Sequence, residues 1–374
     1  MMITKTATND PVHRYQRCLV VPFEGKRKVM STSMHNGGYR EDLSAVFNHD
    51  VNPGPGRLCE YCNSNQNDIV KSFIENDLGL DYEHVAYMQT IVSMENASIQ
   101  SDTYDILSVT AIATASLEVN GGRVGEAATS YEKNGSSINL QPGTINIMVF
   151  VNADMTPGSM ARAMMTATEA KTAAIQELMG GSLNSHGIAT GSGTDNLMII
   201  ANSESSNLLT YAGKHGKLGE LIGRLVMQAV KESLGKHMNL TIQSQHNMFS
   251  RIKRYGADEH KFIQTLKQFE PLDIHLSDAI HNLHVISQRE DIVVLTSFYI
   301  HLLDQWEWGL IANGEVEMAG EKILMEICEI FKVDFNLSRS SSFVSKEKFT
   351  DSMIEKFVSI LCKCSIEENK KNNG

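Results

Sequence analysis

The pattern of secondary-structure signals changes near residue 240, and this change constrains the fold more than any other feature of the sequence. Before it, short runs rich in Val, Ile, Thr and Met alternate with helical segments, which indicates a mixed α/β (α+β) domain. After it, amphipathic segments follow one another and glycine clusters nearly vanish, which indicates an appended all-α region. A chain of 374 residues also exceeds the roughly 250–300 residues at which one hydrophobic core stops growing. We therefore expect two domains.

The same signals set the expected boundaries. We predict a polar N-terminal segment at 1–17, the α/β domain at 18–240, the helical region at 241–366 and a disordered polar tail at 367–374. Strands are predicted at 18–23, 28–34, 84–92, 105–116, 145–152 and 196–202. In the helical region, the amphipathic segments lie at 260–269, 278–287, 315–332 and 346–363.

Two helices are predicted inside the α/β domain. The first spans 159–179, with Ser159 as its N-cap and Gly180 as its stop. The second spans 217–234 and ends at Gly235. Helical spacing predicts that the first helix packs against a sheet through Ala161, Met164, Met165, Thr168, Thr172, Ile175 and Met179.

The charge balance and the apolar runs limit the partners of the protein. The net charge of -11 argues against nucleic acid, because phosphate binding needs a clustered basic surface. The first apolar run, 18–23, is too short for the core of a signal peptide. No run reaches the roughly 18 apolar residues that a membrane-spanning helix needs. We expect a cytoplasmic protein without nucleic-acid or membrane partners, and homo-oligomerisation stays open.

The six cysteines, at positions 18, 59, 62, 328, 362 and 364, are too sparse for a disulfide framework and are expected to be reduced thiols. Cys59 and Cys62 form a single C-x-x-C motif. Because the second pair of a structural zinc site is not spaced to match, incidental cysteines are favoured over zinc.

Four sequence blocks stand out in the first domain: PGTIN at 142–146, ATEAK at 167–171, ATGSGTD at 189–195 and YAGKHGKLGE at 211–220. Their order and spacing resemble the adenosylcobinamide amidohydrolase (CbiZ) family, whose members carry GTIN, TEAK, ATGTGTD and a later YAG-x-H-x-x-LGE block. The run Asn36-Gly37-Gly38 also fits this family. The resemblance covers roughly 18 to 235, with Ser192 in place of a threonine, and leaves the region after 240 without a counterpart.

The resemblance implies a reaction and a substrate. It implies hydrolysis of the amide that joins aminopropanol to a propionate arm of the corrin ring, releasing a cobyric acid and the amino alcohol in corrinoid salvage. The expected partner is thus a small corrinoid substrate, no cofactor is required, and dependence on a divalent metal stays open. The alternatives are a non-catalytic corrinoid carrier and an amidase that acts on another small amide.

Amide hydrolysis needs a nucleophile, donors for the oxyanion and an acid for the departing amine. We predict Glu169, Asp195 and His215 as catalytic residues, because they combine ionisable groups with glycine turns or an otherwise apolar helix. Their structural alternatives are a solvated helix face, an Asx turn and a surface histidine, and the same three residues are also a candidate metal-ligand set. His186 and His35 are the other histidine candidates. The predicted substrate-binding residues are Asn36, Gly37, Gly38, Thr144, Asn146, Lys171, Thr190, Gly191, Ser192, Gly193 and Thr194.

The dipeptide Gly143-Thr144 admits a second hypothesis. Chain cleavage there would free the amine of Thr144 and make its hydroxyl an N-terminal nucleophile. The simpler interpretation is that Thr144 and Asn146 begin a strand and face a pocket. Gly191-x-Gly193 is no dinucleotide fingerprint, because the third glycine is missing and a strand follows. We expect the loops near 143, 191 and 213 to meet the helix that carries Glu169 in one polar pocket.

Overall fold

The computed structural model describes residues 1–54, 66–128, 131, 144–269, 274–334 and 345–372. The chain divides into two compact units, Met1–Thr241 and Ile242–Gly374. The predicted fold class, a mixed α/β region followed by an all-α region, is confirmed. The division falls one residue beyond the boundary expected at 240.

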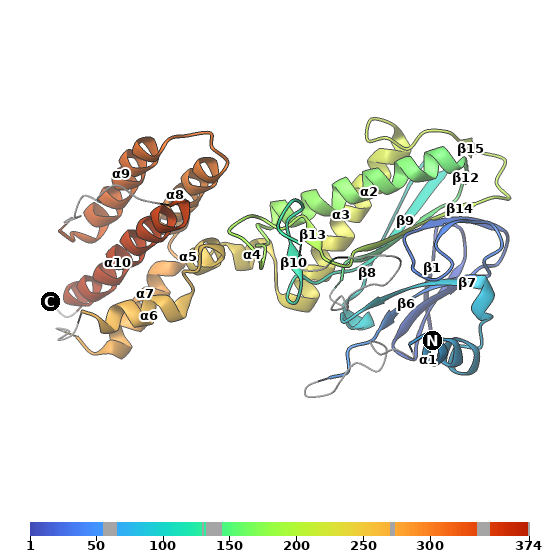
Figure 1. The fold of residues 1–374 in the computed structure, drawn as a ribbon, viewed down its shortest axis with the longest axis horizontal. Helices are drawn as coiled ribbons and strands as arrows, with labels where there is room; N and C mark the ends of the chain where they lie inside the picture. Colours follow the sequence, from blue (N-terminus) through green and yellow to red (C-terminus); the bar gives the residue numbers. More distant parts are fainter. Residues whose placement is uncertain (55–65, 129–130, 132–143, 270–273, 335–344, 373–374) are drawn as a thin grey trace. The chain divides into compact units, whose positions relative to one another are not determined.

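Two β-sheets form the centre of the first unit (Figure 1). The five-stranded sheet contains, in spatial order, β1 (Met2–Lys5), β2 (Pro11–Tyr15), β3 (Cys18–Pro22), β6 (Ala45–Asp50) and β7 (Val85–Thr90). The six-stranded sheet contains, in spatial order, β5 (Gly38–Arg40), β4 (Arg27–Ser31), β14 (Asn196–Asn202), β11 (Asn146–Val151), β9 (Leu107–Thr114) and β8 (Ser98–Tyr104).

Alternation along the strands separates three apolar cores and so defines four layers. In β11, Ile147 packs with the helices α2 (Pro157–Glu177) and α3 (Lys217–Met238), while Met148 packs with the other sheet. In β3, Val21 belongs to the core between the sheets and Val20 to the core under α1 (Gln66–Ser72). Because successive side chains of a strand point to opposite faces, both sheets are covered on both sides. Figure 1 shows α2 and α3 side by side over the six-stranded sheet.

The pairing of the central strands brings distant segments to one edge of the six-stranded sheet. β11 and β14 are parallel, with Asn146 opposite Asn196, so both strands start at the same edge. β9 is antiparallel to β11 and ends there, with Thr114 opposite Asn146. A two-stranded ladder of β10 (Gly121–Gly122) and β13 (Gly191–Ser192) flanks this edge. Residues 144–146 and the block at 189–195 therefore lie next to each other.

Helix α2 begins earlier than predicted. Its N-cap is Thr156, whose hydroxyl accepts a hydrogen bond from the Ser159 backbone N–H at 3.2 Å, and Pro157 occupies the first helical position. Proline suits that position, because the N–H that it lacks has no partner inside the helix. Ser159 is therefore part of the first turn, and the prediction that it caps the helix is wrong.

The buried face of α2 also differs from the prediction. Met165 is 52% exposed and Thr168 is exposed, whereas an alanine stripe is buried with Lys171. Small side chains let the helix backbone approach α3 and the sheet closely, so the alanines outcompete the larger methionines for the core. Of the seven residues predicted to face the sheet, all of which the structure describes, only Ile175 is buried. The buried stripe contains Ala163, Ala167, Ala170 and Ala174.

Three element boundaries differ from the sequence prediction. Helix α3 passes through Gly235 and ends at Met238, because Asn239 adopts the left-handed conformation that closes it. Residues 1–17, expected to precede the domain, supply β1 and β2, and Asp10 is buried against Arg27 with oxygen–nitrogen distances of 2.9 Å. Residues 367–372, expected to be a disordered tail, continue the last helix of the chain.

The second unit is a set of helices around its own apolar core. An ion pair between Arg254 and Asp304 lies inside it, with 5% and 7% of the side chains exposed. Among the described residues, none of the helices combines the length and the apolar composition that crossing a bilayer requires. The helices are α4 (Ile242–Gln245), α5 (Met248–Ile252), α6 (Glu259–Lys267), α7 (Leu276–Ser287), α8 (Glu290–Glu307), α9 (Asn313–Phe331) and α10 (Lys346–Asn372).

Candidate active site

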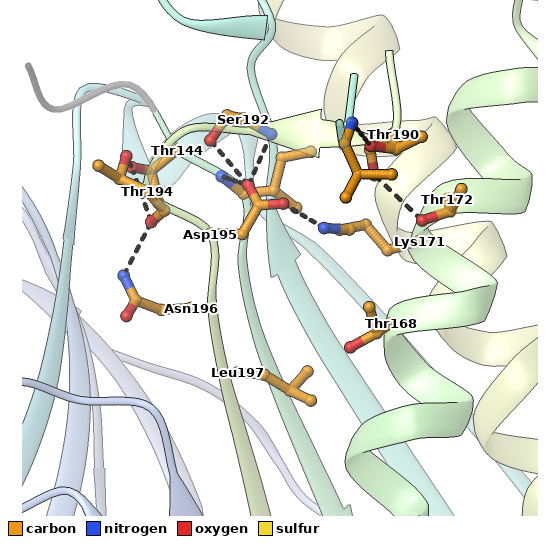
Figure 2. A network of polar contacts seen from close by, with 12 residues as sticks. Thr144, Thr168, Lys171, Thr172, Thr190, Ser192, Thr194, Asp195, Asn196 and Leu197 are labelled. Atoms are coloured by element: carbon orange, nitrogen blue, oxygen red, sulfur yellow. Dashed lines mark hydrogen bonds and ion pairs between the residues drawn. The ribbon is translucent and has the colours of Figure 1, made fainter. Parts of the chain in front are cut away.

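Asp195 occupies the centre of a polar network at the edge where β11 and β14 start (Figure 2). Its Oδ1 accepts hydrogen bonds from the Ser192 backbone N–H at 3.0 Å, the Ser192 hydroxyl at 2.7 Å and the Ile145 backbone N–H at 3.3 Å. Its Oδ2 forms an ion pair with Lys171 Nζ. Three hydrogen-bond donors on one oxygen and an ammonium group on the other hold the carboxylate in one orientation.

Lys171 reaches this carboxylate from the buried face of α2. Its side chain is 11% exposed and that of Asp195 is 20% exposed, so the pair is partly shielded from water but still in contact with it. Burying an ammonium group without a partner is costly, and the carboxylate offsets that cost. The pair therefore needs both members.

The Lys171–Asp195 pair leaves no room for a side chain at Gly191. A Cβ atom at this position would lie 2.1 Å from Asp195 Oδ2 and 2.6 Å from Lys171 Nζ. Both distances are far below a van der Waals contact, so any side chain here displaces the carboxylate or the ammonium group. The glycine of the ATGSGTD block thus allows the loop backbone to pass close to the ion pair.

The loop that carries Asp195 is anchored on two sides. The Thr190 backbone N–H donates to the Gly122 carbonyl at 2.9 Å, and the Thr190 hydroxyl accepts from the Val124 N–H at 2.9 Å. The Thr172 hydroxyl of α2 donates to the Thr190 carbonyl at 3.0 Å. These contacts hold the loop between the 120–126 segment and the helix.

Thr144 and Thr194 meet through their hydroxyl groups at the same edge. Their Oγ1 atoms are 2.6 Å apart, and Thr194 Oγ1 also accepts from the Asn120 side-chain amide at 3.2 Å. The Gly193 N–H donates to the Asn120 carbonyl at 3.1 Å. Asn120 was not predicted as a site residue, although it begins an Asn-Gly-Gly run at 120–122, a pattern typical of turns.

Asn146 links the two sheets. Its side-chain amide donates to Asn48 Oδ1 at 2.7 Å and to the Gln89 carbonyl at 3.0 Å, and its Oδ1 accepts from the Asn196 amide at 3.3 Å. The residue is 1% exposed. Asn146 is therefore a buried hydrogen-bonding residue that connects the two sheets next to the site.

Glu126 holds the neighbouring loop in place. Its Oε2 accepts from the Arg123 N–H at 3.0 Å and from the Ser182 hydroxyl at 2.9 Å, and its Oε1 accepts from the Ser185 hydroxyl. Burial acts to raise the pKa of Glu126, but the hydrogen bonds outweigh burial and lower this pKa. The sequence carried no signal for this residue.

Glu169 and His215 lie away from the Lys171–Asp195 pair. Glu169 and Lys171 are two residues apart on α2 and so point to different faces of the helix. Glu169 pairs with Lys214 at 2.9 Å, with side-chain exposures of 54% and 65%. His215 is exposed just before α3. The loops near 191 and 213 therefore contact different faces of the same helix. Lys171 and Thr172 face the first loop, whereas Glu169 and the buried Thr166, whose hydroxyl donates to the Ala212 carbonyl at 2.8 Å, face the second.

The Asn36-Gly37-Gly38 run forms the turn between β4 and β5. The Asn36 amide donates to the Val85 carbonyl at 2.9 Å and to the Glu83 carbonyl at 3.1 Å, which ties the turn to the start of β7. A Cβ atom on Gly37 would lie 1.9 Å from the Ser33 carbonyl oxygen. His35 stacks on Tyr82 beside this turn, with ring centroids 4.0 Å apart.

Within the described residues there is no group of three or more His, Cys, Asp or Glu side chains that is suited to a metal ion. The predicted ligand set of Asp195, Glu169 and His215 is accordingly not brought together. Cys59 and Cys62 lie outside the described residues. The other four cysteines, at positions 18, 328, 362 and 364, are buried free thiols.

Residues 3–242, which include both sheets and every site residue described above, match the family model for adenosylcobinamide amidohydrolase. The first unit, with its two sheets and three apolar cores, thus falls in a family of amidohydrolases. The chain belongs to the adenosylcobinamide amidohydrolase (CbiZ) family, and the prediction made from the four sequence blocks is confirmed.

Individual proteins similar to this chain give less information about its function. An uncharacterized protein of Methanocaldococcus jannaschii is 32% identical over 253 residues, which are 64% of this chain and 94% of that protein. A crystal structure of a Pyrococcus horikoshii protein covers 62% of this chain and 81% of its own, at 10% identity and a TM-score of 0.31, a value too low to indicate a shared fold.

Proposed function

We propose that the protein hydrolyses the amide that joins aminopropanol to the propionate arm of adenosylcobinamide or a related corrinoid. The products are adenosylcobyric acid and 1-amino-2-propanol, in a salvage reaction. Family membership supports the reaction type. The observation that carries the proposal is the Lys171–Asp195 ion pair, held by the loop at 189–195 at the start of two parallel strands.

This pair suits amide cleavage, because the step that limits amide hydrolysis is the departure of a poor leaving group. The leaving amine must gain a proton as the C–N bond breaks. In the proposed mechanism water adds to the amide carbonyl carbon, the Lys171 ammonium donates a proton to the departing amine as the C–N bond breaks, and the proton that the added water loses restores the ammonium. Asp195 holds the ammonium in position and stabilises its charge. We assign these roles to Lys171 and Asp195 and give Glu169 and His215 no step.

The loop next to the pair also suits the substrate. The backbone N–H groups of Ser192 and Gly193 are taken up by Asp195 and Asn120. The Thr190 hydroxyl, next in the chain to Gly191, accepts from the Val124 N–H and can donate its proton to a carboxamide. A corrinoid carries several carboxamide arms around its ring. In the proposed complex this loop holds the arm to be cut and its neighbours.

The direct test incubates the full chain with adenosylcobinamide and measures free 1-amino-2-propanol and the corrinoid product by mass spectrometry. Stoichiometric release supports the proposal. A spectral titration that shows tight corrinoid binding without amine release identifies a carrier instead. Equal cleavage of a simple small amide identifies a different amidase, and activity before and after chelation measures metal dependence.

Two lysines provide a matched pair of variants, because each forms an ion pair in which one member belongs to α2. Lys171→Met removes the proposed proton donor and is expected to lower amine release by about 100-fold or more. Lys214→Met removes the exposed partner of Glu169 and is expected to leave turnover within about two-fold, because exposed ion pairs contribute little. Equal turnover in both variants would contradict the role of Lys171.

A further inference from the structure

Thr168 is an exposed residue on an otherwise covered face of α2. Residues three, four and seven positions apart share a face of a helix, so Met164, Lys171 and Ile175 lie on the same face as Thr168. Met164 packs against the core between α2 and the sheet, and Lys171 and Ile175 are buried. Thr168 lies between them and is nevertheless exposed. Solvent therefore reaches this face of the helix at Thr168, within one turn of Lys171.

This exposed position lies beside the proposed proton donor. On a helix, Cβ atoms three residues apart are about 5–6 Å from each other, which is the spacing of Thr168 and Lys171. Thr172, four residues after Thr168, donates its hydroxyl to the Thr190 carbonyl at 3.0 Å and so holds the loop that carries Asp195. Figure 2 shows Thr168 and Lys171 extending from the same side of α2. A small molecule bound at Lys171 is therefore within reach of Thr168.

The hydrogen bond of the Thr168 hydroxyl determines which ligand groups it can meet. Its Oγ1 donates to the Met164 carbonyl, one turn earlier in the helix, at 2.9 Å. A threonine hydroxyl has a single proton and two lone pairs, so this bond uses the proton and leaves the oxygen as an acceptor. A ligand group that contacts this oxygen must itself donate a proton. A hydroxyl group meets that requirement, whereas a carbonyl oxygen does not.

Leu197 supplies an apolar group on the sheet side. It belongs to the core between α2 and the six-stranded sheet, together with Ile199 and Ala201 of the same strand. Alternate residues of a strand point to one face, so these three side chains all face the helix. Leu197 is the first of them after Asp195 and retains 7% exposure, whereas the other two are fully buried. The surroundings of the Lys171–Asp195 pair thus include both an acceptor oxygen and aliphatic carbon.

From this arrangement we infer that Thr168 determines the specificity for the leaving amine, because its hydroxyl accepts a hydrogen bond from the hydroxyl of the amino alcohol. The inference rests on the proposed function, in which Lys171 protonates the departing amine. In 1-amino-2-propanol the amine and the hydroxyl are on neighbouring carbon atoms, so an amine at Lys171 directs the hydroxyl to the adjacent Thr168. The methyl group then contacts Leu197. The preferred substrates are amides of vicinal amino alcohols, and amides of simple alkylamines are cleaved less efficiently.

The test compares two corrinoid amides with the full chain. One is adenosylcobinamide, and the other carries propylamine in place of 1-amino-2-propanol and so lacks only the hydroxyl. Mass spectrometry of the released amine gives kcat/KM for each. The unchanged protein is expected to prefer adenosylcobinamide by about 10-fold, the factor that one hydrogen bond typically contributes. Thr168→Val is expected to lose about 10-fold on adenosylcobinamide and to stay within about two-fold on the propylamide, whereas Thr168→Ser is expected to keep the preference.

Thr265→Val in α6 is the matched control, because the Thr265 hydroxyl also donates to the carbonyl four residues earlier, that of Lys261, at 2.9 Å. This variant is expected to keep the preference of the unchanged protein, and thermal melting checks that each variant is folded. Equal kcat/KM on both amides in the unchanged protein, or an equal loss on both in Thr168→Val, overturns the inference and leaves the proposed function intact. No amine release from either corrinoid overturns the proposed function and this inference with it.

Discussion

The ion pair Lys171–Asp195 of the first unit and the ion pair Arg254–Asp304 of the second unit are both withdrawn from water, yet their surroundings differ. The first pair lies at the start of two strands, against a glycine-containing loop, with side-chain exposures of 11% and 20%. The second is 5% and 7% exposed, and Asp304 also accepts from the Tyr255 hydroxyl at 2.8 Å. Burial raises the pKa of Tyr255, which keeps this hydroxyl a donor.

The contrast separates the charge pair to which we assign a catalytic role from one that links helices. Around Asp304, the ring of Tyr255 and the guanidinium group of Arg254 are stacked with 4.6 Å between the guanidinium carbon and the ring centre, and the pair adjoins the apolar core of the second unit. Around Asp195, backbone and hydroxyl donors replace apolar contacts. Polar and partly exposed surroundings leave charged groups able to exchange protons with other molecules. Apolar surroundings leave the ion pair as a structural contact between helices.

The largest expected effect is on turnover in Asp195→Asn. The substitution keeps the shape of the side chain but removes the charge that holds Lys171, so amine release is expected to fall by about 1,000-fold. Steady-state kinetics with adenosylcobinamide measure this loss, and circular dichroism checks the fold. Undiminished turnover would remove Asp195 from the mechanism.

The same substitution in the second unit, Asp304→Asn, is expected to act on stability. It leaves Arg254 buried without a counter-charge, which is expected to lower the free energy of unfolding by about 3–5 kcal/mol. Denaturant titration measures the change, and the variant should turn over normally at low temperature. A folded but inactive Asp304→Asn protein would show that the second unit takes part in the reaction.

Gly191→Ala sharpens the comparison with a smaller change. Because the new Cβ atom would meet Asp195 Oδ2 at 2.1 Å, the pair must separate, and amine release is expected to fall by about 30- to 100-fold. Gly223→Ala in α3 is the control, since no atom lies within 4 Å of its added Cβ. The control is expected to gain about 0.5–1 kcal/mol of stability and to keep its activity. Equal activity in the two variants would argue against a tight pair at the site.

The smallest effect is expected for Glu169→Gln. The exposed pair of Glu169 with Lys214 is worth about 0–1 kcal/mol, and its loss should change turnover by less than about three-fold. A fall as large as that expected for Asp195→Asn would restore Glu169 as a catalytic residue and would place the reaction on the exposed side of α2.

The fold class and the family were predictable because they depend on local patterns and on motif order. Runs rich in Val, Ile, Thr and Met marked β3, β4, β7, β9, β11 and β14, and helix-forming composition with glycine stops marked α2 and α3. The strand β6 escaped notice, because its second half, Asn48-His49-Asp50, is polar and does not extend the apolar run. The polar strand β8 also escaped notice, since its side chains are mostly partly or fully exposed.

The candidate site was only partly predictable from the sequence. The block that contains Gly191 and Asp195 indicated a ligand-binding turn, and Lys171 was marked as a substrate-binding residue. Spacing along α2 could not tell which face carries the site, because two glycine loops lie on different sides of the helix. The large side chains Met164 and Met165 pointed to one face, while the closer packing of Ala163, Ala167, Ala170 and Ala174 selected another.

The sequence by itself determined the family and the change from a mixed α/β region to helices. The tertiary structure alone decided that Lys171 pairs with Asp195, that Thr144 meets Thr194, and that Glu169 faces solvent. The physical reason is the parallel register of β11 with β14, which aligns positions 50 residues apart in the sequence, as in the contact between Thr144 and Thr194. Such pairing depends on the whole sheet, and no local periodicity encodes it.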